Sequence, residues 1–132
     1  MTERRRASSG SAWEPQFGYS RALRAGDMVF VAGTVGTNPD GRAAEGPYAQ
    51  ARRALEIIAA ALVEVGASIQ DVVRTRTFVT DIGFFPMVAR AHLEVFGEVL
   101  PAASLMQVGR LIEDGYVVEI EVDAVVQSGP AT

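Results

Sequence analysis

The sequence predicts an α+β domain in which two helices cover one face of a single β-sheet. Segments with strand-like and helix-like apolar periodicity follow one another along the 132 residues in the order β-β-α-β-α-β-β. Gly46-Pro47 and Asp81 are typical helix starts, and Gly66 and Gly97 are typical helix ends. Hydrophobic residues make up 48% of the chain, which is enough to fill one core.

The first regular elements are expected to form a hairpin. Residues 20–24 and 28–32 have the composition of strands, and Ala25-Gly26-Asp27 supplies a tight turn between them. Residues 33–41 are rich in Gly, Asn and Pro, so a loop is expected to follow.

Two helices and three strands are expected in the rest of the chain. The first helix begins at Gly46-Pro47, repeats apolar residues at helical spacing and ends at Gly66. The second helix is expected over residues 84–96, with Pro86 in its first turn, where the missing N–H costs nothing. Strand-like runs cover residues 72–80, 101–109 and 116–127.

The chain is expected to contain one domain, over residues 17–128, with a short tail at 129–132. Residues 1–16 are rich in Arg, Ser and Gly, so we expect a flexible segment without regular structure. Trp13 is the one large apolar residue there that is suited to anchor the segment on the domain.

A row of acidic residues lies in the last predicted strand. Side chains alternate across a strand, so one face is apolar and the other carries Glu119, Glu121 and Asp123, roughly 7 Å apart. The same alternation places Arg74 and Arg76 on one face of an earlier strand. One interpretation is a set of structural cross-strand ion pairs, which composition alone favours. The other is a site in which a glutamate with a pKa tuned by partial burial activates water.

The face of the sheet away from the helices is expected to mix charged and apolar side chains. Met106 and Val108 in one register, or Leu105 in the other, add apolar area that a monomer leaves exposed. Self-association is therefore predicted.

Composition and motifs exclude several classes of function. A net charge of −4 argues against a protein that grips phosphate backbones, and Arg4 to Arg6 form only a short basic tail. The chain has no cysteine, and no apolar run approaches the roughly 20 residues of a membrane span. No secretory signal precedes the domain, so a cytoplasmic protein without nucleic-acid or membrane partners is expected.

Two sequence features that often form functional sites in other proteins are not assigned a function in this chain. Residues 36–43 have the glycine spacing of a phosphate-binding loop, but Arg42 stands in place of the lysine and Ala43 in place of the hydroxyl. His92 is the only histidine and lies beside the apolar stripe of the second helix, so it receives no role. No metal or cofactor motif is present.

Residues 17–127 contain a series of short motifs that occur in the same order in one known protein family. They are Tyr19-Ser20, Val31-Ala32-Gly33, Ala49-Gln50-Ala51-Arg52, Asp71-Val72-Val73-Arg74-Thr75, Phe78-Val79-Thr80-Asp81, Pro101-Ala102-Ala103-Ser104 and Val118-Glu119-Ile120-Glu121. Together they resemble the Rid family, also called YjgF. The resemblance implies a chorismate-mutase-like fold and homotrimers whose sheets face inward as a barrel, with ligand clefts between neighbouring subunits.

The resemblance also implies a chemistry. Founding members of the family hydrolyse imines and enamines, such as 2-aminoacrylate or 2-iminobutyrate, to a 2-oxo acid and ammonia, and they need no cofactor. An arginine binds the substrate carboxylate, and a glutamate positions the attacking water. By the same resemblance, Glu119 stands at the position of that glutamate, Tyr19 at the tyrosine that borders the cleft, and Gly33 at the glycine whose backbone approaches it.

Three positions depart from the family pattern. Ala103 stands where the arginine belongs, Ala32 where a serine is expected, and Ala89 where an asparagine is expected on the second helix. The chain therefore resembles a branch that lacks the substrate-binding arginine. Either Arg90 or Arg76 supplies a substitute charge, or the ligand carries no carboxylate. With Leu105, the two alanines at 32 and 103 make a smaller and more apolar cleft.

The leading hypothesis is an imine or enamine deaminase-like hydrolase of a small metabolite of unknown identity, with Glu119 as the water-handling residue. The alternative is a non-catalytic trimeric ligand-binding or chaperone-like protein that keeps the cleft. A ribonuclease or translation inhibitor is the weakest hypothesis, because the chain lacks a basic patch with interleaved aromatic residues.

Overall fold

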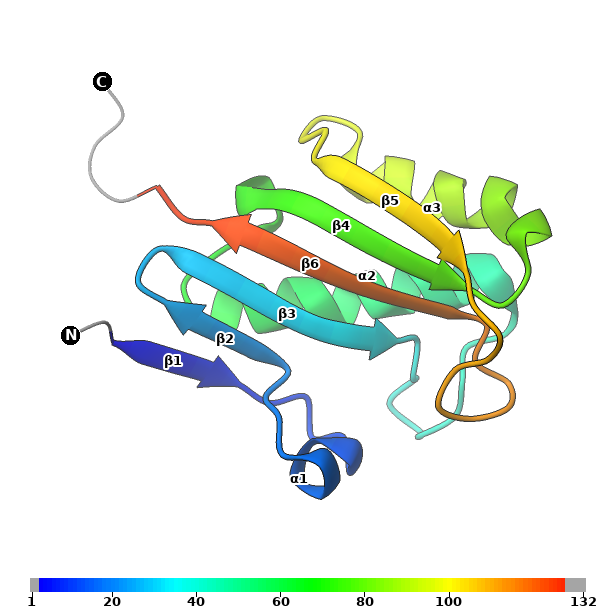
Figure 1. Cartoon of the computed structure of the whole chain (residues 1–132), viewed down its shortest axis with the longest axis horizontal. Helices are drawn as coiled ribbons and strands as arrows, with labels where there is room; N and C mark the ends of the chain where they lie inside the picture. Colours follow the sequence, from blue (N-terminus) through cyan, green and yellow to red (C-terminus); the bar gives the residue numbers. More distant parts are fainter. Residues whose placement is uncertain (1–2, 128–132) are drawn as a thin grey trace.

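The computed structural model describes residues 3–127, in which six strands form one mixed sheet (Figure 1). The strands are β1 (Arg4–Ala7), β2 (Ala22–Ala25), β3 (Met28–Val35), β4 (Val72–Val79), β5 (Ala102–Gln107) and β6 (Val118–Val125). They lie in the order β1-β2-β3-β6-β4-β5, with only β4 and β5 parallel to each other. The helices are α1 (Trp13–Phe17), α2 (Gly46–Glu64) and α3 (Phe85–Phe96), with 3-10 turns at Ile69–Asp71 and Ile82–Phe84. The predicted α+β class is confirmed.

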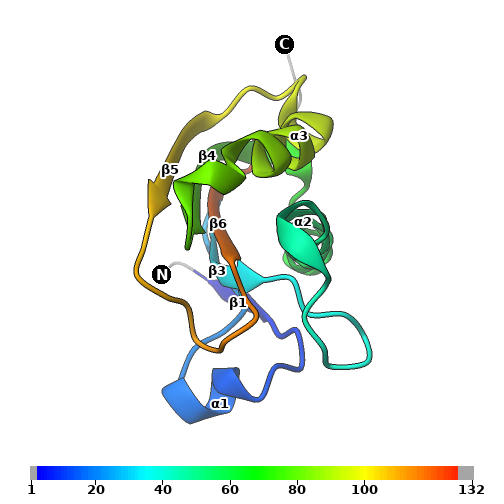
Figure 2. The ribbon, with the colours of Figure 1, turned by 90° about the vertical axis from the view of Figure 1, so that its right-hand side faces the viewer.

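The core lies between the sheet and the two long helices. Both α2 and α3 lie behind the sheet in Figure 1, and Figure 2 shows α2 against the same face from the side. The apolar residues of β6 that alternation assigned to one face, from Val118 to Ala124, are buried against this layer. Leu55, Ile58 and Leu62 of α2 fill the other side of the core. Within residues 3–127, no helix is long and apolar enough to cross a membrane.

No described helix covers the opposite face of the sheet, which we call the open face (Figures 1 and 2). It carries the acidic residues of β6 together with apolar side chains, of which Phe30 is 42% exposed and Met106 is 40% exposed. This mixture agrees with the pattern expected from the sequence. Self-association through this face stays a prediction.

The prediction that residues 1–16 lack regular structure is wrong. Arg4–Ala7 forms β1, which pairs antiparallel with β2 from Arg4↔Ala25 to Ala7↔Ala22, and Ala7 enters the core. Trp13 begins α1 and packs edge-on against Tyr116 at 6.1 Å between ring centroids, as the anchoring role predicted. A four-residue strand with three arginines has no apolar alternation to reveal it, and the backbone hydrogen bonds of β2 decide its structure. The predicted tail at 129–132 lies outside the described residues.

Candidate functional site

The site is built around one extra residue in β3. Val31 lies opposite Val122 of β6, and Thr34 lies opposite Ile120, so β3 advances three residues while β6 advances two. Ala32 and Gly33 therefore share the space opposite a single residue. Such a β-bulge leaves backbone groups outside the regular hydrogen-bond ladder and bends the strand that contains it.

The side chain of Arg21 donates hydrogen bonds to this bulge. Its side chain is buried, with 4% of the residue exposed. One terminal nitrogen donates to the Gly33 carbonyl at 2.6 Å and to Thr34 Oγ1 at 3.1 Å, and the other donates to the Tyr19 hydroxyl at 3.0 Å. The bulged backbone and the Tyr19 side chain are thus held by the same guanidinium group.

Glu14 of α1 compensates the charge of Arg21. Its Oε2 lies 3.4 Å from Arg21 Nε, and only 5% of the residue is exposed. Glu14 also accepts hydrogen bonds from the Ser8 hydroxyl and from the backbone N–H and hydroxyl of Ser9. Burial raises the pKa of Glu14, but the bonds from Ser9 and Ser8 and the charge of Arg21 together outweigh it, so the net pKa is lowered.

Glu119 is the half-buried carboxylate of the open face, and it lies directly over Gly33. A Cβ atom on Gly33 would be only 2.5 Å from Glu119 Oε2, so the carboxylate occupies the space that the glycine leaves. Within residues 3–127 this carboxylate has no hydrogen bond or ion pair, and no buried polar atom lacks a partner, so solvent reaches its oxygens. Burial and the neighbouring charge of Glu121 raise the pKa of Glu119, against a smaller opposing effect of Arg21.

The other two acidic residues of β6 are ion-paired. Arg76 of β4 lies 3.2 Å from a carboxylate oxygen of Glu121 and 3.2 Å from one of Asp123. The structural ion-pair interpretation is therefore confirmed for Glu121 and Asp123 through Arg76. Within residues 3–127, Arg74 forms no ion pair, and Glu119 has no such partner either. The three carboxylates share a face and differ in environment.

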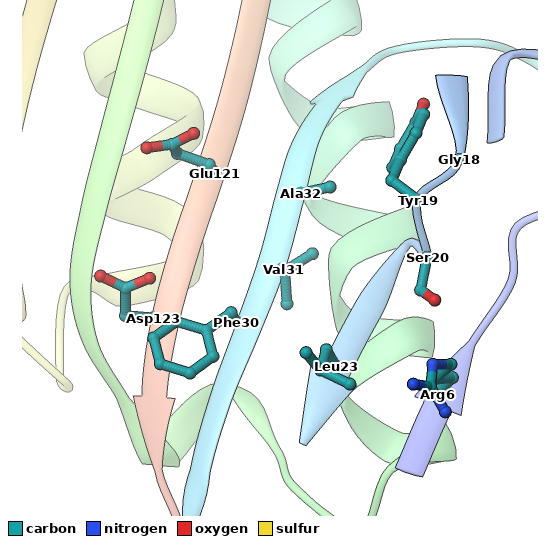
Figure 3. Close-up of a pocket in the computed structure, with 10 residues that line it drawn as sticks. All are labelled: Arg6, Gly18, Tyr19, Ser20, Leu23, Phe30, Val31, Ala32, Glu121 and Asp123. Atoms are coloured by element: carbon teal, nitrogen blue, oxygen red, sulfur yellow. The ribbon is translucent and has the colours of Figure 1, made fainter. Parts of the chain in front are cut away.

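A hollow of about 440 Å³ opens on the same face beside the bulge (Figure 3). Tyr19 and Ala32 border it, and Leu23 and Phe30 form its apolar floor. Its lining is Arg6, Gly18, Tyr19, Ser20, Leu23, Phe30, Val31, Ala32, Glu121 and Asp123. Tyr19 and Ala32 thus line the hollow, whereas Gly33 and Glu119, which contact each other next to Ala32, are not part of its lining.

The remaining residues expected in the cleft lie elsewhere in the same chain. Ala103 and Leu105 of β5 pair with Thr75 and Thr77, which are buried on the helix-covered face, so both point away from the face of Glu119. Ala89 and Arg90 belong to α3 in the helix layer. The Arg90 guanidinium lies 3.9 Å from the centroid of the Tyr48 ring, and it does not approach the open face.

His92 has a structural environment. Its Nε2 lies 2.8 Å from Thr75 Oγ1, and its ring packs on Phe96 with 4.7 Å between centroids. Burial lowers the pKa of the imidazole. These contacts join α3 to β4 and agree with the absence of a functional assignment.

Sequence reasoning missed Arg21, Glu14 and Gln50. Arg21 and Glu14 are the only oppositely charged pair that the described structure buries almost completely, and the run Glu14 to Arg21 gave no periodic signal. Buried Gln50 donates to the Ala44 and Gly115 carbonyls and accepts from the Val117 N–H, joining two loops to α2. Its position inside the Ala49-Gln50-Ala51-Arg52 motif was the available signal.

Comparison with known proteins identifies the family. Residues 9–126 match the family model described as Endoribonuclease L-PSP. A crystal structure of a YjgF-family member from Mycobacterium tuberculosis superposes with a TM-score of 0.87 at 45% identity, covering 94% of this chain and 100% of that one. The chain belongs to the Rid family, also called YjgF.

Other Rid-family relatives cover most of both chains. An uncharacterised protein of Streptomyces coelicolor is 40% identical over 121 residues, which are 91% of this chain and 90% of that protein. A Salmonella typhimurium protein named 2-iminobutanoate/2-iminopropanoate deaminase is 34% identical over 111 residues, 81% of this chain and 84% of that protein. The crystal structure of the Escherichia coli YjgF gene product has a TM-score of 0.80 at 29% identity, covering 92% and 94% of the two chains.

The environment of Glu119 predicts a pH-dependent effect of Glu119→Gln on stability. The pKa of Glu119 is higher in the folded state than in the unfolded state. The contribution of protonated Glu119 to the stability of the fold is therefore complete below the unfolded-state pKa, and it is lost as the pH rises through the folded-state pKa. Glu119→Gln is therefore expected to be more stable than wild type at neutral pH, and the gain is expected to vanish below pH 4.5. The free energy of unfolding, measured in urea at neutral pH and again below pH 4.5, tests this expectation. Glu98→Gln is the control, because Glu98 is exposed. A Glu119→Gln variant that is less stable at neutral pH contradicts the assignment.

Proposed function

We propose that this Rid-family protein hydrolyses an imine or enamine to a carbonyl compound and ammonia, with Glu119 holding the attacking water. The supporting observation is the carboxylate itself. It is half-buried, has a raised pKa, is reached by solvent and lacks an ion-pair partner among the described residues, whereas its two neighbours on β6 are paired with Arg76. The name of the Salmonella typhimurium relative supports the same chemistry.

The proposed reaction needs one group that moves protons. Water adds to the imine carbon, and a proton from the water goes to the nitrogen, which gives a carbinolamine. The proton of the new hydroxyl group then passes to the nitrogen as the carbon–nitrogen bond breaks, which releases ammonia and leaves the carbonyl. An enamine first becomes the imine by transfer of a proton from its nitrogen to its carbon. The Glu119 carboxylate accepts the proton of the water and returns it to the nitrogen, and a raised pKa brings its basicity nearer to that required at neutral pH.

We further propose that the complete cleft forms between copies of the chain in a homotrimer. Glu119 lies on the open face, whereas Ala103 and Leu105 are oriented toward the other face, so one chain alone does not enclose all of the expected cleft residues. The exposed Phe30 and Met106 give the open face apolar area for such an interface. The cytoplasmic location and the absence of a nucleic-acid partner stay predictions.

The charges around Glu119 favour a substrate without a carboxylate. Position 103 is alanine, Arg21 donates to protein groups on three sides, and Arg76 is shared by two carboxylates. The described part of the open face therefore offers a substrate anion little compensation near Glu119. Arg6 and Arg74 also lie on the open face, but by strand register both are level with Asp123 and not with Glu119. An uncharged imine, or its protonated cationic form, therefore suits the surroundings of Glu119 better.

The second candidate is a ligand-binding or chaperone-like protein without chemistry. The alanine at position 103 favours it, because the family's carboxylate clamp is missing. A metabolite that raises the melting temperature without being consumed distinguishes this candidate from a hydrolase.

The Glu119→Gln variant tests the catalytic proposal. Ammonia release from freshly generated alkyl and aryl imines, and from 2-iminobutyrate, is expected to fall by about 100-fold or more, since a general acid–base group contributes at least that much. Wild-type activity is expected to decline with falling pH at a value above 4.5, where Glu119 gains its proton. Exposed Glu98→Gln is the control. Equal rates for wild type and Glu119→Gln on every substrate would end the hydrolase proposal.

Gly33→Ala tests whether the position of the Glu119 carboxylate is required for imine hydrolysis. The added methyl requires Glu119 to move, because its Oε2 lies within 2.5 Å of the new atom, and the flexible end of the side chain is able to do so. We expect a stability change within about 1 kcal/mol and a loss of imine hydrolysis of about tenfold or more. Gly109→Ala, where no atom lies within 4 Å of an added Cβ, is the matched control. Full activity in Gly33→Ala would contradict the role of the close approach.

Ala103→Arg tests the missing clamp. A charged hydrogen bond to a substrate carboxylate is worth about 1.5–3 kcal/mol, so the kcat/KM for 2-iminobutyrate is expected to rise by about 10- to 150-fold relative to an imine without a carboxylate. Ala102→Arg places the same charge on the opposite face of β5 and is expected to give no such gain. An equal gain in both variants would mean that general charge, and not a clamp, is responsible.

A further inference from the structure

Arg21 lies in the interior of the candidate site and has no part in the proposed chemistry. Its Nε donates to Ser9 Oγ at 3.3 Å, and its two terminal nitrogens donate to Gly33, Thr34 and Tyr19. These acceptors come from the segment after β1, from the bulge of β3 and from the loop before β2. A guanidinium that is directed to three separate segments at once fixes their relative positions.

The burial of this arginine depends on the N-terminal segment. A buried cation without a partner is strongly unfavourable, and here the compensation comes from Glu14, seven residues earlier in the chain. Glu14 is in turn held by Ser8 and Ser9. Residues 8–14 therefore decide whether Arg21 is able to stay next to the bulge.

The bulge connects Arg21 with Glu119. Arg21 binds the carbonyl of Gly33, and the Cα of the same residue lies under the Glu119 carboxylate with no room for a side chain. A rotation or shift of the Gly33 peptide would therefore change the space available to the Glu119 carboxylate and the orientation of the peptide dipole next to it. The positive charge of Arg21 also lowers the pKa of Glu119, against the effects of burial and of Glu121.

We propose that Arg21 is a positioning residue of the site, which holds the Gly33 bulge and the Tyr19 hydroxyl in place for Glu119, and that Glu14 keeps Arg21 there. The segment that carries Glu14 is then part of the site and not an appendage. The proposal deepens the proposed function, and it rests on it only in calling Glu119 catalytic. The physical link between Arg21 and Glu119 is measurable without turnover.

The test uses a double variant that removes the charges of Glu14 and Arg21 together. Arg21→Met alone leaves Glu14 buried without its partner, which is strongly destabilising, so the single variant is not the test. The double variant Glu14→Met/Arg21→Met replaces both charges by side chains of similar length. Arg24→Met is the matched control, since Arg24 lies on β2 as well but donates to Val65 and Gly66 at the far end of α2.

The readout is the titration of Glu119 followed by NMR of its ¹³C-labelled carboxyl group, with the Gly33 amide resonance recorded in the same samples. The charges near Glu119 are Glu121 on its own strand, Arg76 on β4 and Arg21. The double variant leaves Glu121 and Arg76 in place and removes Arg21 together with Glu14, of which only Arg21 has a direct effect on the pKa of Glu119. We expect the pKa of Glu119 to rise in the folded double variant, because the lowering effect of Arg21 is lost, and the Gly33 resonance to be displaced, whereas both stay unchanged in Arg24→Met. A wild-type titration of Glu119 in the folded double variant would overturn the proposal.

Kinetics separate this proposal from the proposed function. If the protein hydrolyses imines, the acid limb of its pH–rate profile is expected to move to higher pH in the double variant, along with the pKa of Glu119. If no substrate is turned over by any variant, the hydrolase proposal fails, while the NMR titration still decides whether Arg21 positions Glu119.

Discussion

The geometry of the site depends on the β-bulge in β3. One residue inserted between Val31 and Thr34 turns the backbone at Gly33 toward two different side chains, the guanidinium of Arg21 at its carbonyl and the carboxylate of Glu119 above its Cα. Glycine at this position lets the carboxylate approach the strand. The regular pairing on either side of the bulge keeps β3 and β6 in a register that the core requires.

Strand alternation explains why the functional side chains lie where they do. The apolar residues of β6 from Val118 to Ala124 are buried against α2, and the same alternation leaves Glu119, Glu121 and Asp123 on the open face. Arg76 pairs with the second and third of these carboxylates, whereas Glu119 has no ion-pair partner among the described residues and is half-buried with a raised pKa. Core packing and the proposed chemistry are thus divided between the two faces of one strand.

Much of this arrangement was predictable from the sequence. The two long helices α2 and α3, five of the six strands, the two faces of β6 and the family motifs all follow local patterns, because period and turn residues are local properties, whereas the short helix α1 was missed. The strand at Arg4–Ala7 was not predictable, since its structure comes from pairing with β2 and not from its own composition. The Glu14–Arg21 pair and the extra residue in β3 were also missed. The extra residue depends on strand register, and the ion pair depends on how α1 packs beside the start of β2, neither of which a short motif records.

The central claim is that Glu119 directs a water molecule in a cleft that a neighbouring copy completes. A crystal structure of the assembled protein at a resolution that shows ordered water tests it most directly. We expect a homotrimer with a cavity beside Glu119 and a water molecule within hydrogen-bond distance of its carboxylate. A monomer, or a Glu119 carboxylate paired with an arginine of a neighbouring copy and with no space beside it, would contradict this role of Glu119.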